Sequence, residues 1–236
     1  MKIPKIIHYV WIGNKKKDKK TQKIIEGWKK LLPDYLFMEW GEKEYDINRL
    51  AYTKQAYEHK KYAYVSDVIR LYALKQFGGI YLDTDVEVIQ NFDQFLNLDS
   101  FLGFESDDRI STAVMGAAKN QNWVNELYAS YVNEKFVNDD GIPNYYTNVE
   151  RLTNYLVHKY KMNLDNSMQM LNDNIVIYPQ DFFSPIDMKT GKLNMTSRTV
   201  SIHNFYGSWV PLKSKINKKI YRLLMNIKLL EKKGEL

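Results

Sequence analysis

Two acidic residues, Asp83 and Asp85, lie two positions apart in the apolar stretch IYLDTDVEVI, residues 80–89. If this stretch is one strand, both side chains point to the same face, because successive residues alternate between faces. Two neighbouring carboxylates near a core repel each other and lose hydration, so they need a cation or strong donors to stay ionised. A hard divalent cation fits such oxygen ligands and normally brings a phosphate-bearing ligand with it. A solvent-facing pair at a strand end is the alternative, and an isolated Asp-x-Asp pattern favours it.

A second acid and a cation precede this pair in SDVIRLYALKQFGG, residues 66–79. Asp67 and Arg70 are three residues apart, so a helix places them on one face, one turn from each other. They could form an ordinary surface ion pair of small energetic value. Alternatively, the helix holds one acid and one bidentate cation beside the acidic strand, where they could bind a polyhydroxyl ring.

The elements that must position these residues alternate between strand and helix. Apolar and aromatic runs predict strands at 3–13, 35–40 and 80–89, and apolar residues at helical spacing predict helices at 24–32 and within 45–77. This order indicates an α/β architecture with a mainly parallel sheet. In the second half, strands are expected at 101–105, 112–118, 175–179 and 199–203, and helices at 121–136 and 148–161.

Composition and charge exclude several classes of protein. The 236 residues fit one large domain, and the absence of cysteine excludes a disulfide framework, a cysteine nucleophile and a thiolate metal site. The formal net charge of +6 comes from residues 211–236, which hold eight basic and two acidic residues, while the rest holds 26 of each sign. A basic nucleic-acid-binding domain is therefore not expected. No apolar run is long enough to span a membrane, and the opening lacks the features of a signal peptide, so we expect a cytoplasmic protein.

Three motifs in this order resemble glycosyltransferase family 32. The segment YVSDVIRLYALKQFGGIYLDTDVEV, residues 64–88, resembles the family's DXD region, and the opening KIPKIIHYVWIG, residues 2–13, resembles its first strand. The segment HNFYGSW, residues 203–209, resembles its C-terminal element. The family includes yeast mannosyltransferases and bacterial capsule enzymes, and the same pattern occurs in the glucosyltransferase domains of large clostridial toxins.

The resemblance implies a GT-A fold over residues 1–210, with a nucleotide-sugar site at the carboxyl ends of the strands. It implies that Trp11 stacks on the nucleobase, for which a core tryptophan is the alternative, and that the backbone of Val10 contacts the base edge. Ser66 and Asp67 match positions near the ribose and sugar hydroxyls, and Arg70 matches a residue that contacts the donor sugar.

The resemblance also implies a metal site and a phosphate site. Asp85 would bind Mn²⁺ or Mg²⁺ directly, and Asp83 would bind the ribose or sugar and the ion through water. His203 matches a late metal ligand, with a structural histidine as the alternative. Ser208 and Trp209 match groups that bind the β-phosphate of the donor.

The function implied is a retaining, metal-dependent transfer of a hexose from a nucleotide-diphosphate sugar, with a UDP-sugar favoured, to a saccharide acceptor in bacterial surface polysaccharide synthesis. A front-face mechanism needs no separate nucleophile. Glu105 and Asp107 either line the acceptor side or face solvent. The alternatives are an effector or toxin-like enzyme that glycosylates a protein, and an inactive module that binds sugar nucleotides.

Residues 211–236 form a separate unit in this interpretation. Apolar residues recur there at helical spacing with lysines on both flanks, which predicts a basic amphipathic helix. Such a helix could lie on the anionic inner face of the cell membrane and place the site beside a lipid-linked acceptor, or it could pack on the domain.

Overall fold

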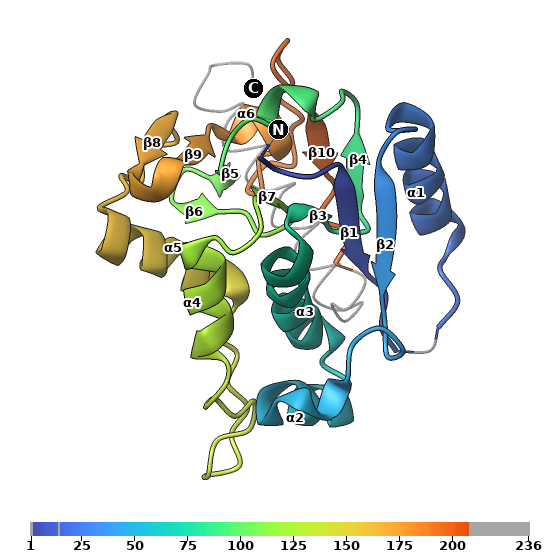
Figure 1. The fold of residues 1–236 in the computed structure, drawn as a ribbon, viewed down its shortest axis with the longest axis vertical. Helices are drawn as coiled ribbons and strands as arrows, with labels where there is room; N and C mark the ends of the chain where they lie inside the picture. The colour runs from blue at the N-terminus through green and yellow to red at the C-terminus, as the bar shows by residue number, and fades with distance from the viewer. Residues whose placement is uncertain (1, 14, 208–236) are drawn as a thin grey trace, which may run out of the picture.

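An eight-stranded mixed sheet forms the centre of the computed structural model, which describes residues 2–13 and 15–207 (Figure 1). The strands follow the order β2 (Leu36–Trp40), β1 (Ile6–Val10), β3 (Gly79–Leu82), β7 (Val114–Ala117), β5 (Ser100–Ser106), β9 (Ile175–Tyr178) and β8 (Gln169–Leu171), and β6 (Arg109–Ile110) pairs with β5.

The sheet is mixed, so the prediction of a mainly parallel sheet is wrong. Three pairs are parallel, namely β1 with β2, β1 with β3, and β5 with β9. Four pairs are antiparallel, namely β7 with β3, β7 with β5, β6 with β5, and β8 with β9. A parallel pair needs a crossover of about a dozen residues or more. The loops that join β5, β6 and β7 are far shorter than that, so the chain can only reverse there.

Helices cover both faces of the sheet. Alternate residues of β3 show this, because Tyr81 packs with α2 (Ala51–Glu58), α3 (Tyr62–Phe77), α4 (Asn122–Ser130) and α5 (Asn148–Tyr160) in one core. Ile80 and Leu82 pack on the other face with α1 (Lys19–Leu31) and α6 (Gln180–Phe183). A two-stranded antiparallel sheet of β4 (Val86–Val88) and β10 (Ser201–His203) adds Val86 and Val88 to this second core.

Local sequence explains how α3 delivers the chain into β3. Helix α3 ends at Phe77 and is capped by Gly78, whose φ of 66° is a conformation that favours glycine. Gly79 has a φ of 111°, and a Cβ atom there would lie 2.7 Å from the Ile6 carbonyl oxygen of β1. The paired glycines therefore let β3 enter the sheet directly beside β1.

The stretch 80–89 is not one strand, which corrects the premise about Asp83 and Asp85. Strand β3 ends at Leu82, and β4 begins at Val86 in the second sheet. The Val86 N–H donates to the Asp83 carbonyl oxygen at 3.0 Å, so residues 83–85 form a turn between the sheets. The two carboxylates are brought together by this turn rather than by strand alternation.

The other differences concern element ends and short elements. The predicted helix 121–136 stops at Ser130, and β6, β8 and α6 were not predicted. The helical stretch 45–77 contains two separate helices, α2 and α3, as expected for a stretch in more than one piece. Among the described residues, none of the helices combines the length and apolar character needed to cross a membrane. The predicted helix 211–236 and the boundary at residue 210 lie outside the described residues.

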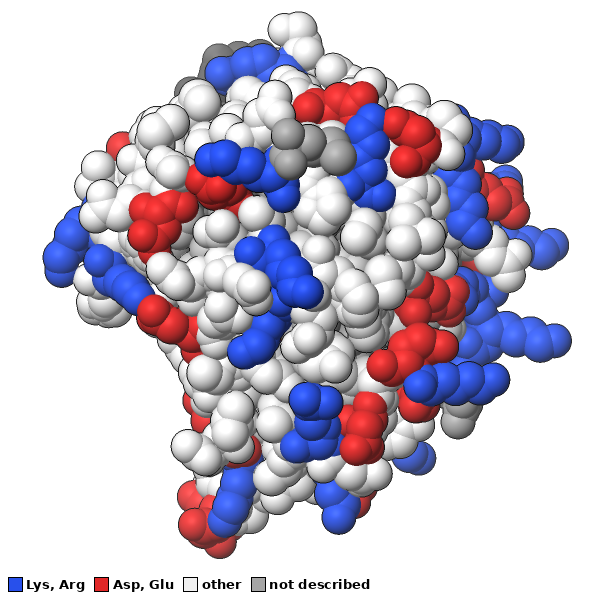
Figure 2. Space-filling view, in the orientation of Figure 1, with Lys and Arg blue, Asp and Glu red and all other residues white. Residues whose placement is uncertain are grey.

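Charges of both signs are interspersed on the face shown in Figure 2, where basic side chains gather along the edge over α1. Helix α1 carries five exposed lysines and begins at Asp18, whose carboxylate accepts from the Thr21 N–H at 2.8 Å.

Candidate active site

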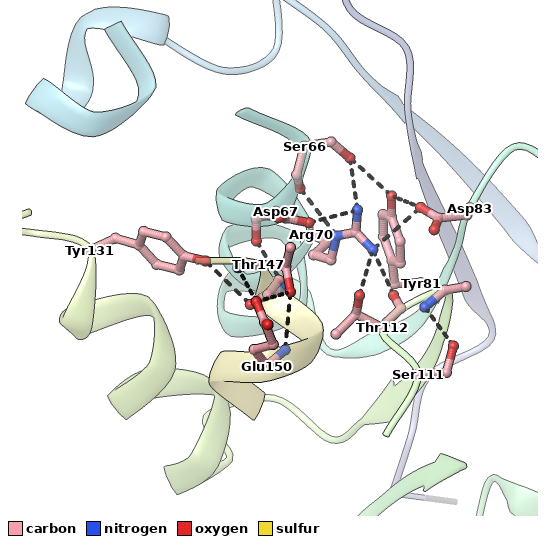
Figure 3. Close-up of polar contacts among 12 residues, drawn as sticks. Ser66, Asp67, Arg70, Tyr81, Asp83, Ser111, Thr112, Tyr131, Thr147 and Glu150 are labelled. Carbon is pink, nitrogen blue, oxygen red and sulfur yellow. Dashed lines mark hydrogen bonds and ion pairs between the residues drawn. The ribbon is translucent and has the colours of Figure 1, made fainter. Parts of the chain in front are cut away.

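Arg70 is the centre of a buried polar network at the carboxyl end of β3 (Figure 3). It lies on α3 with 5% of its surface exposed, and its guanidinium lies 3.1 Å from Asp67 Oδ1 and 3.3 Å from Asp83 Oδ1. It also donates to the Thr112 carbonyl oxygen at 2.7 Å and to Ser66 Oγ at 3.2 Å. Arg70 therefore joins α3 to the turn after β3 and to the segment before β7. Its contact with Asp67 is the pairing that their spacing on a helix predicts.

Tyr81 supports the same network from β3. Its hydroxyl donates to Asp83 Oδ1 at 2.8 Å and lies 3.2 Å from Ser66 Oγ, and the Arg70 guanidinium lies 4.6 Å from its ring centroid. Burial raises the pKa of Tyr81 well above its ordinary value, and the nearby Arg70 opposes that shift. The hydroxyl therefore stays protonated at neutral pH and can serve as a donor to Asp83.

Asp67 is a carboxyl group with an unusual pKa. Burial raises the pKa to about 6, against the lowering effect of the Arg70 charge. The Asn148 side-chain amide at the start of α5 donates to the Asp67 carbonyl oxygen at 3.4 Å, and the Tyr131 hydroxyl donates to Asn148 Oδ1 at 3.3 Å. Helix α5 is thereby held against the part of α3 that carries Asp67.

Asp83, Asp85 and His203 form a candidate metal centre. Their ligand atoms lie within 4.8 Å of one another, and their side chains are 27%, 20% and 11% exposed. His203 comes from β10, which pairs with β4 directly after the turn. The structure therefore brings together the three residues expected to bind the metal, although 118 positions separate Asp85 from His203.

The segment after β10 fixes Asp85 in this cluster. The backbone N–H of Tyr206 donates to Asp85 Oδ2 at 2.8 Å, and the Asn204 side chain donates to the Asp85 carbonyl oxygen at 3.0 Å. Burial acts to raise the pKa of Asp85, but the hydrogen bond and charge of His203, together with the Tyr206 N–H, outweigh it and lower that pKa. Burial acts to lower the pKa of His203, but the hydrogen bond and charge of Asp85, together with the charges of Asp83 and Glu105, outweigh it and raise that pKa.

The donor set fits a divalent cation. Two carboxylates and one imidazole suit Mn²⁺ or Mg²⁺ better than a soft metal. The His203 ring directs Nε2 toward Asp85 Oδ1 at a distance of 3.4 Å. Its other nitrogen, Nδ1, is buried and has no hydrogen-bond partner. Asp83, Asp85 and His203 are the residues that would hold the ion.

Trp11 and Val10 lie at the carboxyl end of β1, the edge of the sheet where the resemblance implies the nucleotide-sugar site. Trp11 is partly exposed and belongs to neither core, while its indole N–H donates to the Lys15 carbonyl oxygen at 2.6 Å and Lys17 Nζ lies 5.7 Å from its ring. Val10 is buried and pairs with Trp40 of β2. Stacking of Trp11 on a nucleobase stays a prediction.

The remaining predicted residues have mixed outcomes. Ser66 belongs to the Arg70 network, whereas Ser208 and Trp209 lie outside the described residues. Glu105 is buried in β5, where burial raises its pKa, and Asp107 is exposed.

Sequence reasoning missed three groups of this network. Tyr81 was considered only an apolar position of the DXD segment, and Thr112 and Asn148 carry no sequence signal, because their roles arise only when β7 and α5 pack against α3.

Comparison with known proteins identifies the same region. Residues 18–102 match the family described as glycosyltransferase sugar-binding region containing DXD motif. Inositol phosphoceramide mannosyltransferase 3 of Schizosaccharomyces pombe is 33% identical over 128 residues, which cover 50% of this chain and 34% of that protein. Subversion of eukaryotic traffic protein A of Legionella pneumophila is 29% identical over 111 residues, covering 36% of this chain and 17% of that protein. The chain thus spans about a third or less of the length of these relatives.

A solved structure supports the fold. The PaToxG glycosyltransferase superposes with a TM-score of 0.54 and 21% identity, covering 66% of this chain and 70% of that chain. The match confirms the predicted GT-A fold for the described α/β domain. Arg70, Asp67, Asp83 and Asp85 all lie within residues 18–102, so the segment that is similar to the DXD-containing sugar-binding region carries both the Asp67–Arg70 pair and the two acids of the candidate metal centre.

Proposed function

We propose that this chain is a metal-dependent glycosyltransferase that moves a hexose from a nucleotide-diphosphate sugar to a saccharide acceptor with retention of configuration. The convergence of Asp83, Asp85 and His203 beside the buried Asp67–Arg70 pair carries this proposal, because it joins a cation site to a hydroxyl-binding site within the DXD segment.

Each side chain has a definite task in this proposal. Asp83 and Asp85 hold the cation through carboxylate oxygens, and His203 holds it through a ring nitrogen. Arg70 fixes the positions of Asp67 and Asp83, since its N–H groups are directed at these acids, Ser66 and Thr112. Asp67, whose side chain is 14% exposed, keeps a carboxylate edge for a sugar hydroxyl. A bound divalent ion supplies positive charge that stabilises the departing diphosphate.

The proposed donor rests on the opening of the sequence and on the named relatives. The Val10–Trp11 opening favours a UDP-sugar, whereas the relatives named as mannosyltransferases favour mannose as the transferred hexose. We propose surface polysaccharide synthesis in the cytoplasm as the setting, with a lipid-linked acceptor at the membrane face if residues 211–236 form a basic amphipathic helix.

A protein-glycosylating effector is a second candidate. It is favoured by similarity to a Legionella protein named for subversion of eukaryotic traffic, and by likeness of fold to the PaToxG glycosyltransferase. Labelled sugar that appears on protein rather than on saccharide would select this alternative.

Slow donor hydrolysis without an acceptor tests the proposal. Purified protein with Mn²⁺ is offered UDP-glucose, UDP-galactose, UDP-N-acetylglucosamine and GDP-mannose, and the release of free sugar is measured. We expect hydrolysis of one donor, its loss in EDTA and its recovery with Mn²⁺. Asp85→Asn should abolish it, while Glu87→Gln, at an exposed position two residues away, should retain it. Hydrolysis by the Asp85 variant in chelator would contradict the assignment.

A further inference from the structure

The chain between α4 and α5 forms a narrow arm, defined here as residues 136–146, that projects at the α2 end of the molecule (Figure 1). Val137 and Pro143 form an antiparallel bridge, and the Asn144 N–H donates to the Phe136 carbonyl oxygen at 2.7 Å. The Val137 N–H donates to Gln55 of α2 at 3.1 Å. The arm is therefore an ordered hairpin attached to α2.

This ordered arm exposes large apolar side chains. Ile142 is 60% exposed, Tyr145 is 52% exposed and Tyr146 is 37% exposed. Ordering a loop costs conformational entropy, and the parts of these side chains that stay in water contribute nothing to offset that cost. Clustered exposed apolar groups on a surface commonly mark a binding site.

The arm continues directly into the candidate active site. The Tyr64 hydroxyl of α3 donates to the Tyr145 carbonyl oxygen at 3.4 Å, and the two rings lie 5.9 Å apart with a 55° angle between their planes. Tyr64 lies one helical turn before Asp67. After Tyr146 the chain enters α5, whose residue Asn148 donates to the Asp67 backbone. Tyr64 is therefore three positions before Asp67 on α3, and Tyr145 is three positions before Asn148, the residue that bonds the Asp67 backbone.

The chemistry of the cluster fits a sugar ring. A pyranose has apolar C–H faces and a polar edge, so it matches tyrosine rings that combine an apolar face with a hydroxyl. Basic groups brace the rings, with Lys61 Nζ 5.4 Å from the Tyr145 centroid and the Arg151 guanidinium 5.1 Å from that of Tyr146. The exposed Asp139 and Asp140 at the tip of the arm disfavour an anionic membrane as the occupant.

We propose that Tyr64, Tyr145 and Tyr146 form the acceptor subsite and bind a saccharide ring beside the donor sugar at Asp67. This inference rests on the proposed glycosyltransferase function and names the substrate class of its second half.

The test compares transfer with donor hydrolysis in the full chain. The donor found by hydrolysis is combined with methyl α-mannoside, methyl α-glucoside or methyl α-galactoside as acceptor. Tyr145→Ala and Tyr146→Ala should each raise the acceptor KM about ten-fold, the worth of one aromatic contact. The fall in transfer should exceed any fall in donor hydrolysis. Tyr145→Phe, which keeps the ring, should restore most of the affinity.

A matched control and two opposing results complete the test. Tyr155→Ala removes a tyrosine of α5 that bonds Glu126 and packs on Tyr160, so it should leave the acceptor KM unchanged. The subsite is wrong, while the proposed function stands, if the native enzyme hydrolyses a donor but uses none of the three glycosides. The same conclusion follows if both alanine variants have the acceptor KM of the native enzyme. If no donor is hydrolysed, the proposed function itself fails.

Discussion

Acid should destabilise this protein through one buried histidine, His8 of β1. The indole N–H of Trp40 donates to His8 Nδ1 at 3.1 Å, so the other ring nitrogen carries the proton and donates to the Gly78 carbonyl oxygen at 2.7 Å. The side chain is fully buried, and burial lowers its pKa from 6.5 to about 4 against the opposing effect of the Gly78 bond. His8 therefore ties β1 to the glycine turn that leads into β3, but only as the neutral ring.

The size of the effect follows from proton linkage. The unfolded chain takes up a proton near pH 6.5, whereas the folded chain does so only near pH 4, so stability falls as pH decreases between these values. The folded state should lose about 2 kcal/mol from this group by pH 5 and roughly 3 kcal/mol below pH 4, since one pKa unit corresponds to about 1.4 kcal/mol.

Urea unfolding of native protein and His8→Gln between pH 8 and pH 4 measures this loss. Carboxyl groups also contribute, because Asp85 has a lowered pKa, whereas Asp67 has a raised one. The difference between the two pH profiles isolates His8, and His59→Gln at an exposed site controls for loss of a histidine. Parallel profiles for native protein and His8→Gln would refute the reasoning.

Three further predictions concern the site and the tail. Arg70→Gln leaves Asp67 and the partly buried Asp83 without their cation, so the free energy of unfolding should fall by about 3–5 kcal/mol, with partial recovery in Arg70→Lys; equal stability of the glutamine variant in urea would count against the network. Trp11→Ala should weaken donor binding by about 1–2 kcal/mol in calorimetry if the ring stacks on a base, and an unchanged Kd would remove Trp11 from the donor site. The full chain should float with anionic liposomes at low salt and leave them at high salt, while a chain that ends at Val210 should not float; identical behaviour of the two would exclude a membrane role for residues 211–236.

The fold was predictable where local signals agree with packing. The apolar runs, the Gly78-Gly79 stop and the helical spacing before it were enough to place β1, β2, α3 and β3. The pairing of β7 with β3 was not predictable, because local sequence does not show which strands become neighbours in the sheet. The break between β3 and β4 was missed because Val86 and Val88 continue the strand pattern, although they belong to another sheet.

The site was predictable in its residues more than in its geometry. The spacing of Asp67 and Arg70 on a helix predicted their contact, and the resemblance of the motif supplied His203. The link between Arg70 and the Thr112 carbonyl could not be predicted, because any residue type offers a backbone oxygen. The same limit applies to the Tyr206 N–H that holds Asp85.

Binding of Mn²⁺, followed by electron paramagnetic resonance in the presence of UDP, tests the central claim most directly. We expect one Mn²⁺ bound per chain by native protein and by Glu87→Gln, and loss of that binding in Asp85→Asn. The His203→Ala variant should bind more weakly. Equal Mn²⁺ binding by native protein and Asp85→Asn would contradict the claim that the turn after β3 and the end of β10 form the metal centre of a glycosyltransferase.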